Sequence, residues 1–176
     1  GENYISNEDN CIYVNELAYD MGFRNGDQIL SFDDFVPENF GMLQANLARE
    51  SASKATVLRD GDTLNIYIDH SRMGEILNTP GMFSLARPFI VDQVPETSPN
   101  YGRGLIPDDR IISIDSTAVA FVQDAEPVLL ENAGQDIVTD ILRDGDTITL
   151  DLQVGYISLD AGIIAFIFEI ELQDFA

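Results

Sequence analysis

The hexapeptide Leu-Arg-Asp-Gly-Asp-Thr occurs twice in this chain of 176 residues, at positions 58–63 and again at positions 142–147. Related segments precede both copies: FRNGDQILSFDD spans residues 23–34, and LIPDDRIISIDS spans residues 105–116. In both cases a helix-like stretch separates the earlier segment from the hexapeptide. Self-similarity of this kind is typical of a repeated structural unit, and it limits the possible folds more than any single residue does.

The spacing of the two copies sets the size of the repeat. Asp27 corresponds to Asp109, 82 positions later, and the two hexapeptides lie 84 positions apart, so the second copy contains a small insertion. A unit of about eighty residues is large enough for one small domain. We therefore predict two domains in tandem, the first over residues 1–88 and the second over residues 89–176.

Each repeat is predicted to combine strands with a helix. The segments 27–34 and 109–116 alternate apolar and polar residues, which is typical of strands. The segment 37–50 has apolar residues at helical spacing behind a proline. The segment 121–132 has a similar apolar face, but Pro127 interrupts it, so this helix is expected to begin late or to kink. These patterns predict an α+β fold.

The repeated hexapeptide itself is predicted to form a hairpin turn. Alternating strands flank Asp60-Gly61 and Asp144-Gly145, and a type I′ turn needs positive φ at both central residues, which Asp-Gly supplies. The alternative is a calcium-binding loop, which requires alternating oxygen ligands and a glutamate near its twelfth position. Residues 63–67 form an apolar strand pattern instead. The sequence therefore favours a structural role over a metal site.

The charge of the chain limits the classes of partner. It carries 31 acidic and 9 basic residues, a formal net charge of −22, and such a surface repels nucleic acids and anionic lipids. Apolar residues make up 45% of the sequence, which is enough for a folded core. The chain has a single cysteine, Cys11, so it cannot form an internal disulfide. The longest apolar run, residues 161–168, is far shorter than the roughly 20 residues of a membrane helix. The chain as given is expected to be soluble.

No group of residues has the spacing of an active site. The only histidine, His70, lies between Asp69 and Ser71, and neighbours on a strand point to opposite faces, so a Ser-His-Asp relay is not expected. The zinc-binding patterns HExxH and CxxC do not occur, and residues 100–107 lack the Lys-Ser/Thr of a phosphate-binding loop. We predict an exposed His70 and no catalytic residue, metal site or cofactor in this chain.

Residues 91–115, VDQVPETSPNYGRGLIPDDRIISID, resemble a stretch of the PDZ domains of bacterial proteases. That stretch runs from a strand through proline and Ser-Pro to Gly-Leu, a Gly-Asp pair, an apolar strand and Asp-Gly. Gly104-Leu105 matches the Gly-Leu; the first repeat keeps the Gly-Asp pair as Gly26-Asp27, whereas the second has Asp108-Asp109. The resemblance implies two PDZ-like domains in tandem, each a small, mostly antiparallel β-sandwich or partly open barrel capped by one or two helices.

Two such domains in tandem resemble the periplasmic PDZ pair of RseP-type site-2 proteases, which are bacterial intramembrane zinc metalloproteases. The resemblance covers nearly the whole chain. It implies a periplasmic region that gates or recruits peptide substrates in regulated intramembrane proteolysis, attached to the transmembrane protease domain of an inner-membrane parent protein. In that family an HExxH helix and an Asp-bearing helix hold the zinc, and this chain contains neither. Zinc is therefore expected in the parent protease domain only.

The same resemblance implies where a peptide would bind. The fold of that family is circularly permuted, so the peptide-binding strand of each domain lies at its C-terminal end, here residues 81–88 and 165–172. A bound peptide would lie beside this strand, with a helix (38–49 or 121–132) as the other wall. The residues predicted to bind peptide are Met82, Phe83, Ser84, Leu85 and Ala86 in the first domain, and Phe166, Ile167, Phe168, Glu169 and Ile170 in the second.

Charge favours one class of ligand in the second domain. Glu169 and Glu171 follow an apolar run, and they would repel an anionic peptide terminus. We therefore expect internal extended segments, or bulky apolar tails of trimmed membrane-protein substrates, as partners. A gate needs only bulk over an entrance, so weak or undetectable peptide binding is expected if the pair acts in that way.

The sequence also fits functions other than that of a site-2 protease. The chain also fits a peptide-binding PDZ module of another envelope protease, of HtrA or tail-specific type, or of a secretion assembly. A free-standing scaffold that belongs to no enzyme is a further alternative, and a soluble enzyme ranks last because no nucleophile, base or metal set is present. The residues that flank this chain in the full gene product discriminate among these functions: an upstream HExxH segment indicates the site-2 protease, and an upstream Ser-His-Asp domain the HtrA type.

Overall fold

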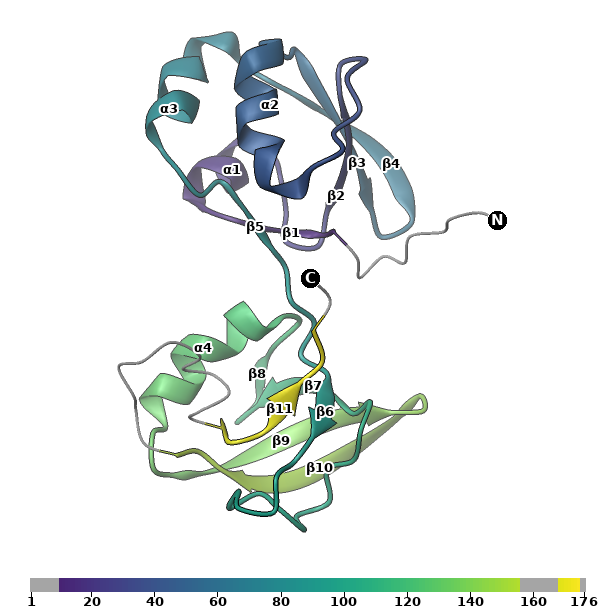
Figure 1. Cartoon of the computed structure of the whole chain (residues 1–176), viewed down its shortest axis with the longest axis vertical. Helices are drawn as coiled ribbons and strands as arrows, with labels where there is room; N and C mark the ends of the chain where they lie inside the picture. Colours follow the sequence, from purple (N-terminus) through teal and green to yellow (C-terminus); the bar gives the residue numbers. More distant parts are fainter. Residues whose placement is uncertain (1–9, 156–167, 175–176) are drawn as a thin grey trace. The chain divides into compact units, whose positions relative to one another are not determined.

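The computed structural model of the chain describes residues 10–155 and 168–174. The chain divides into two compact units, residues 1–86 (unit 1) and residues 87–176 (unit 2), which are described separately below (Figure 1). Each unit contains two antiparallel sheets, and the described strands close no barrel. The prediction of a mostly antiparallel fold with a few helices is therefore confirmed. No helix in the described part of the chain is both long and apolar enough to cross a membrane.

Unit 1 has paired strands at both of its described ends. Its strands are β1 (Ile12–Val14), β2 (Gln28–Phe32), β3 (Lys54–Arg59), β4 (Asp62–Tyr67) and β5 (Phe83–Leu85). Its helices are α1 (Glu16–Met21), α2 (Leu43–Glu50) and α3 (Met73–Asn78), with the short 3-10 helices η1 (Phe40–Met42) and η2 (His70–Arg72). Strands β2, β3 and β4 form one sheet, and β1 pairs with β5 to form the other.

The helix predicted over residues 37–50 begins later than its apolar spacing suggests. The side chain of Asn39 accepts a hydrogen bond of 2.9 Å from the N–H of Gly41 and thereby caps η1, which leads directly into α2. Leu43 and Leu47, one turn apart, form the buried face of α2. The helical segment therefore starts after the asparagine cap, three residues beyond the predicted start.

Unit 2 repeats the strand–helix–hairpin part of this order, but among its described residues it has no helix between its first two strands and has an additional short strand. Its strands are β6 (Val91–Gln93), β7 (Arg110–Ile114), β8 (Thr117–Ala118), β9 (Asp136–Arg143), β10 (Asp146–Gln153) and β11 (Glu171–Leu172), and its long helix is α4 (Val122–Glu131). One sheet has the order β10-β9-β7-β8, and the other pairs β11 with β6. Helix α4 contains Pro127 but does not begin late, because the carboxylate of Asp124 accepts a hydrogen bond of 2.9 Å from the N–H of Phe121 at its start.

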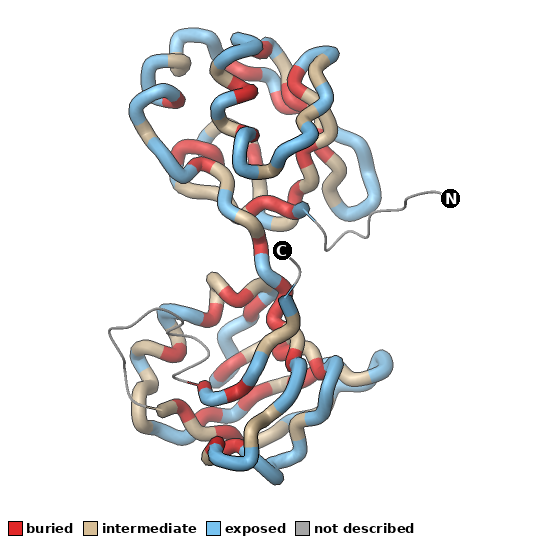
Figure 2. Tube along the Cα trace, in the orientation of Figure 1, coloured by how far each residue is buried: buried red, intermediate tan, exposed pale blue. Residues whose placement is uncertain are grey.

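Each unit has its own hydrophobic core, made by strand residues and the inner faces of the helices (Figure 2). The strands β2 and β7 have the same order of buried and half-buried positions, and both pair with the following long strand through an irregularity after their second residue. The largest fully buried side chains include Phe23, Phe32 and Leu47 in unit 1, and Phe89, Phe168 and Leu129 in unit 2. The duplication predicted from the hexapeptide thus extends to the packing of the core.

The two hexapeptides form the predicted tight hairpin turns. In unit 1, Arg59 pairs with Asp62, so only Asp60 and Gly61 lie in the loop between β3 and β4. Their φ angles are 51° and 83°, both positive as a type I′ turn requires. The turn between β9 and β10 repeats this geometry, with φ of 49° and 84° at its two central residues. The repeated Asp-Gly is therefore a turn, as the sequence indicates.

The arginine of the first hexapeptide makes a buried ion pair. Arg59 donates two hydrogen bonds to the carboxylate of Asp27, at 2.7 and 2.8 Å, and one of 2.9 Å to the carbonyl of Gly22. The side chain of Asp27 is fully buried and also accepts a bond of 2.9 Å from the N–H of Arg24. The hydrogen bond to Asp27 raises the pKa of Arg59, so its charge is retained. A fork-like guanidinium thus joins the hairpin to the loop before β2.

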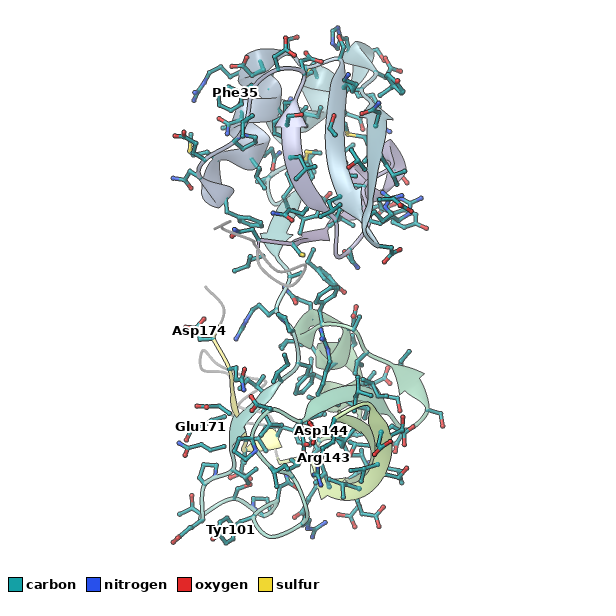
Figure 3. The ribbon with its side chains drawn as sticks, turned by 90° about the vertical axis from the view of Figure 1, so that its right-hand side faces the viewer. Phe35, Tyr101, Arg143, Asp144, Glu171 and Asp174 are labelled. Atoms are coloured by element: carbon teal, nitrogen blue, oxygen red, sulfur yellow. The ribbon has the colours of Figure 1, made fainter. Side chains whose placement is uncertain are left out.

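The arginine of the second hexapeptide makes the same contacts in unit 2. Arg143 donates to the fully buried carboxylate of Asp109 at 2.7 and 2.8 Å and to the carbonyl of Gly104 at 2.7 Å. Asp109 also accepts a bond of 2.8 Å from the N–H of Ile106. In Figure 3, Arg143 and the following residue, Asp144, are labelled where β9 ends. The spacing of the hexapeptides thus also preserves a side-chain contact that the sequence did not reveal.

Candidate peptide-binding site

The strand predicted to bind peptide in unit 1 is β5, and its backbone is paired on one side. The N–H of Asn15 donates to the carbonyl of Met82 at 3.1 Å, and the N–H of Ala86 donates to the carbonyl of Cys11 at 2.8 Å, so both bonds face β1. Backbone groups alternate in direction along an antiparallel ladder. The N–H and carbonyl of Phe83 therefore point away from β1. Among the described strands, β1 is the only partner of β5.

The side chains of the five predicted residues in unit 1 differ in accessibility. Met82 and Ala86 are buried in the core, so their side chains cannot contact a ligand. Phe83 and Leu85 are half-buried, and Ser84 is exposed. The ring of Phe83 packs perpendicular to that of Phe23, with 5.0 Å between centroids. The structure brings the five residues together in one segment, but a role for them in peptide binding stays a prediction.

The predicted helical wall is held beside the start of β5 by one side chain. Gln44 of α2 donates through Nε2 to the carbonyls of Ile76 and Thr79, at 2.8 and 2.7 Å, and its Oε1 accepts from the N–H of Met82 at 3.1 Å. These bonds join α2 to the end of α3 and to the residue before β5. Sequence reasoning missed this role, because nothing in the local pattern of the helix connects Gln44 with residues more than thirty positions away.

In the corresponding segment of unit 2, the described residues 168–170 do not form the predicted strand. Phe166 and Ile167 lie outside the described residues. Phe168 is helical and fully buried, with its ring perpendicular to that of Phe89 at 6.0 Å, and Ile170 is also buried. Glu169 has a φ of 54°, which turns the chain between these two buried residues. Among the described residues of this segment, the strand therefore begins at β11, because the positive φ of Glu169 interrupts the extended backbone.

A buried asparagine fixes the approach to β11. The side chain of Asn100 donates to the carbonyls of Phe168 and Gln153, at 2.7 and 2.9 Å, and accepts a bond of 2.7 Å from the N–H of Gln153. It is 1% exposed, and these bonds satisfy its amide inside the core. The residues before β11 are thereby tied to the end of β10, a contact that the sequence did not suggest.

A small cavity lies beside β11 in unit 2. Its volume is about 220 Å³, and its lining includes Pro95, Ser98, Ile170 and the two glutamates that flank Ile170. One of these glutamates, Glu171, is labelled in Figure 3 and accepts a hydrogen bond of 2.8 Å from Gln93. The two glutamates give this cavity an acidic lining, and the predicted repulsion of an anionic peptide terminus stays a prediction.

The surroundings of His70 do not form a catalytic relay. His70 is exposed, as predicted, and begins η2, with its Nε2 3.1 Å from the carbonyl oxygen of Ala52. The carboxylate of Asp69 accepts from the N–H of Ser71 at 2.9 Å and caps η2. The hydrogen bonds from Ser71 lower the pKa of Asp69. Within the described residues, no group of three or more His, Cys, Asp or Glu side chains is placed to hold a metal ion.

Comparison with known proteins gives weak structural similarities, among them the two that follow. No family model matches the chain, and no curated protein matches it. A solution structure of the protein GtR34C from Geobacillus thermodenitrificans is similar over 39% of this chain and 79% of its own length, with 24% identity and a TM-score of 0.35. The PDZ domain of an SdrC-like protein from Listeria monocytogenes is similar over 47% of this chain and 84% of its own length, with 20% identity and a TM-score of 0.38.

Proposed function

We propose that both units are PDZ-like modules that bind extended peptide segments by strand addition. The observation that carries this proposal is β5 in unit 1, which has β1 as its strand partner while the N–H and carbonyl of Phe83 point to the other side. A bound segment would hydrogen-bond to these groups as an additional strand. Helix α2, joined to the start of β5 through Gln44, would form the second wall.

The accessible side chains of β5 support an apolar ligand. Phe83 is half-buried and Ser84 is exposed, so a segment lying along β5 would meet one aromatic face and one small polar residue. Main-chain hydrogen bonds depend little on sequence, and these two side chains would supply the selectivity. The net charge of −22 disfavours acidic segments. The ligand class is therefore an uncharged or basic, apolar, internal segment of a polypeptide.

From the sequence resemblance, we also propose a parent protein for this chain. On this proposal the chain is the periplasmic PDZ pair of an RseP-type site-2 protease. The pair filters or recruits substrates for a zinc-dependent protease domain in the membrane. The test is the sequence that flanks this chain in the full gene product, where an upstream apolar helix with HExxH is expected. A Ser-His-Asp protease domain in that place would overturn this assignment and favour the HtrA type.

Strand addition is tested by NMR titration of the full ¹⁵N-labelled chain. The probe is a peptide of eight residues, alternating valine and serine, that is acetylated and amidated so that it carries no terminal charge. We expect the largest saturable amide shifts in residues 82–86 and 43–48. Shifts confined to other strands, or no saturable shift, would overturn the proposal. Submicromolar affinity would favour recognition over a steric gate.

Two proline variants sharpen this test. Phe83→Pro removes the N–H that points away from β1 and places a ring on that side of β5, so binding should be lost. Thr63→Pro is the matched control: the hairpin closes at the Arg59–Asp62 pair, so the N–H of Thr63 points away from β3 on the outer edge of β4. It should leave binding unchanged. Equal binding by both folded variants, checked by their amide spectra, contradicts strand addition at β5.

A further inference from the structure

Unit 1 contains a cavity that no predicted peptide-binding residue lines. Its volume is about 340 Å³, and it lies between α2 and the segment that follows β2. Its lining includes Phe35, Val36, Glu38, Met42, Asn46 and Arg49. Phe35 is labelled in Figure 3. The volume is at the lower end of what small-ligand sites have, enough for one apolar side chain and an adjoining peptide group.

One face of α2 points into this cavity. Met42, Asn46 and Arg49 are four and three positions apart, so they lie above one another on the same side of the helix. Gln44 projects from a different side and bonds to the segment before β5. The cavity is therefore separate from the strand-addition site, and a ligand in it would contact α2 without contacting β5.

The carboxamide of Asn46 is buried in the lining and makes no hydrogen bond within the described residues. Asn46 is only 5% exposed. In the described part of the chain, every completely shielded side-chain nitrogen or oxygen has a hydrogen-bond partner. The amide atoms of Asn46 have none, so they are not completely shielded, and their small exposure is to the cavity that they line. The amide thus has no protein partner and is open to the cavity, so a ligand there could hydrogen-bond to it.

A carboxamide donates and accepts hydrogen bonds at once, which matches the N–H and carbonyl of a peptide group. The walls around Asn46 are apolar and accessible: Val36 is 65% exposed and Met42 is 38% exposed. At the rim, Glu38 and Arg49 carry opposite charges. This lining does not select an anion, and the net charge of −22 disfavours one.

We propose that this cavity is a second peptide site, in which an uncharged, apolar residue of another polypeptide inserts its side chain between Val36 and Met42. The peptide group of that residue hydrogen-bonds to the carboxamide of Asn46. The site would let unit 1 hold a second stretch of a substrate, or a different polypeptide, while β5 is occupied. Its failure would leave strand addition at β5 untouched, because the two sites share no ligand-contacting side chain.

The test is an NMR titration of the full ¹⁵N-labelled chain with N-acetyl-leucine methylamide, which presents one apolar side chain between two peptide groups. We expect saturable shifts at the amides of Val36 and Met42 and at the side-chain N–H₂ of Asn46. N-acetyl-leucine, which ends in a free carboxylate, should bind more weakly. The proposal is overturned if no shift at these groups saturates, or if the shifts occur in residues 82–86 instead.

Variants separate binding from folding. Asn46→Leu keeps the volume and removes a partnerless amide, so the fold should be retained, whereas affinity for the probe should fall roughly tenfold or more through the loss of two hydrogen bonds. Val36→Ser should weaken binding severalfold, and Val138→Ser, an exposed valine of unit 2, is the matched control that should not. Unchanged affinity in Asn46→Leu would overturn the assignment of Asn46.

Discussion

In both units a glycine carbonyl accepts a hydrogen bond from the arginine of the hexapeptide, but the chain reaches that glycine through different structures. In unit 1, helix α1 is capped by Asn15 and ends at Gly22, whose carbonyl Arg59 binds. In unit 2, a loop without a regular helix leads to Gly104, whose carbonyl Arg143 binds. The difference shows which contacts specify this fold: the arginine, its buried aspartate and the glycine carbonyl are kept, and the path between the first strand and that glycine varies.

A second difference lies on the long helices. Gln44 follows the buried Leu43 in α2, and Glu126 follows the buried Ala125 at the corresponding position of α4. The carboxamide of Gln44 donates to two carbonyls and accepts from one N–H. An ionised glutamate has no hydrogen to donate, so it cannot reproduce these contacts. Glu126 therefore cannot donate as Gln44 does, and among the described residues this attachment of the helix to the approach of the last strand occurs in unit 1.

The largest expected effect concerns the contact that both units share. Arg59→Ala leaves the fully buried carboxylate of Asp27 without its charged partner, which should lower the free energy of unfolding by about 3–5 kcal/mol. Arg143→Ala should act in the same direction through Asp109. Denaturant unfolding followed by circular dichroism measures both. Arg72→Ala, which removes an exposed ion pair with Glu75, is the control and should change little.

A smaller effect should separate the two helices. Gln44→Ala removes three hydrogen bonds that join α2 to the segment before β5, and we expect a loss of about 1–2 kcal/mol in unfolding free energy. Glu126→Ala changes an exposed side chain and should have no measurable effect. Hydrogen exchange of the amides from 76 to 84 should accelerate in Gln44→Ala. If both variants unfold alike, Gln44 has no special role in unit 1.

The two hairpin turns should respond equally. Gly61→Ala and Gly145→Ala both force a side chain into positive φ, at 83° and 84°, with nothing else within 4 Å of the added carbon. Each should lower stability by about 1 kcal/mol through backbone strain alone. Gly74→Ala, in helix α3 and also unobstructed, should instead raise stability slightly. Unequal losses at the two turns would show that the hairpins differ outside their shared hexapeptide.

The smallest effect is electrostatic and concerns the cap of η2 in unit 1. Hydrogen bonds from Ser71 lower the pKa of Asp69 below its ordinary value. The ionised cap therefore stabilises the fold at neutral pH, and this contribution is lost as the pH falls through the lowered pKa. NMR titration of the Asp69 carboxyl should give a midpoint below the usual aspartate range, and Ser71→Ala should move it upward. A midpoint unmoved by Ser71→Ala contradicts this origin.

Local chemistry explains what the sequence could predict. The hairpins follow from Asp-Gly between alternating strands, and β2 and β7 follow from their alternation, because turn and strand preferences act over a few residues. The Arg59–Asp27 pair joins positions 32 residues apart, and the contacts of Gln44 span similar distances, so no local pattern reveals them. The predicted strand 165–172 includes residues 168–170, which form a core-filling turn instead, because an apolar run fits a strand as well as such a turn.

The candidate site was predictable only in outline. Residues 83–85 form β5, and Gln44 of α2 bonds to Met82, the residue before it; the role of these residues in peptide binding stays a prediction. Met82 and Ala86 are buried in the core, whereas Ser84 is exposed. This division depends on tertiary packing, which the alternation of residues in the sequence does not specify. Asn46 gave no sequence signal, because an asparagine on a helix is usually solvated. Only its burial beside a cavity distinguishes it.

The first and last described strands of each unit pair with each other, which brings the two ends of the unit close together. Ile12 is opposite Leu85 in unit 1, and Val91 is opposite Leu172 in unit 2, so each unit is entered and left at points about 5 Å apart. A host protein could therefore receive one unit within a surface loop while keeping the two ends of that loop together.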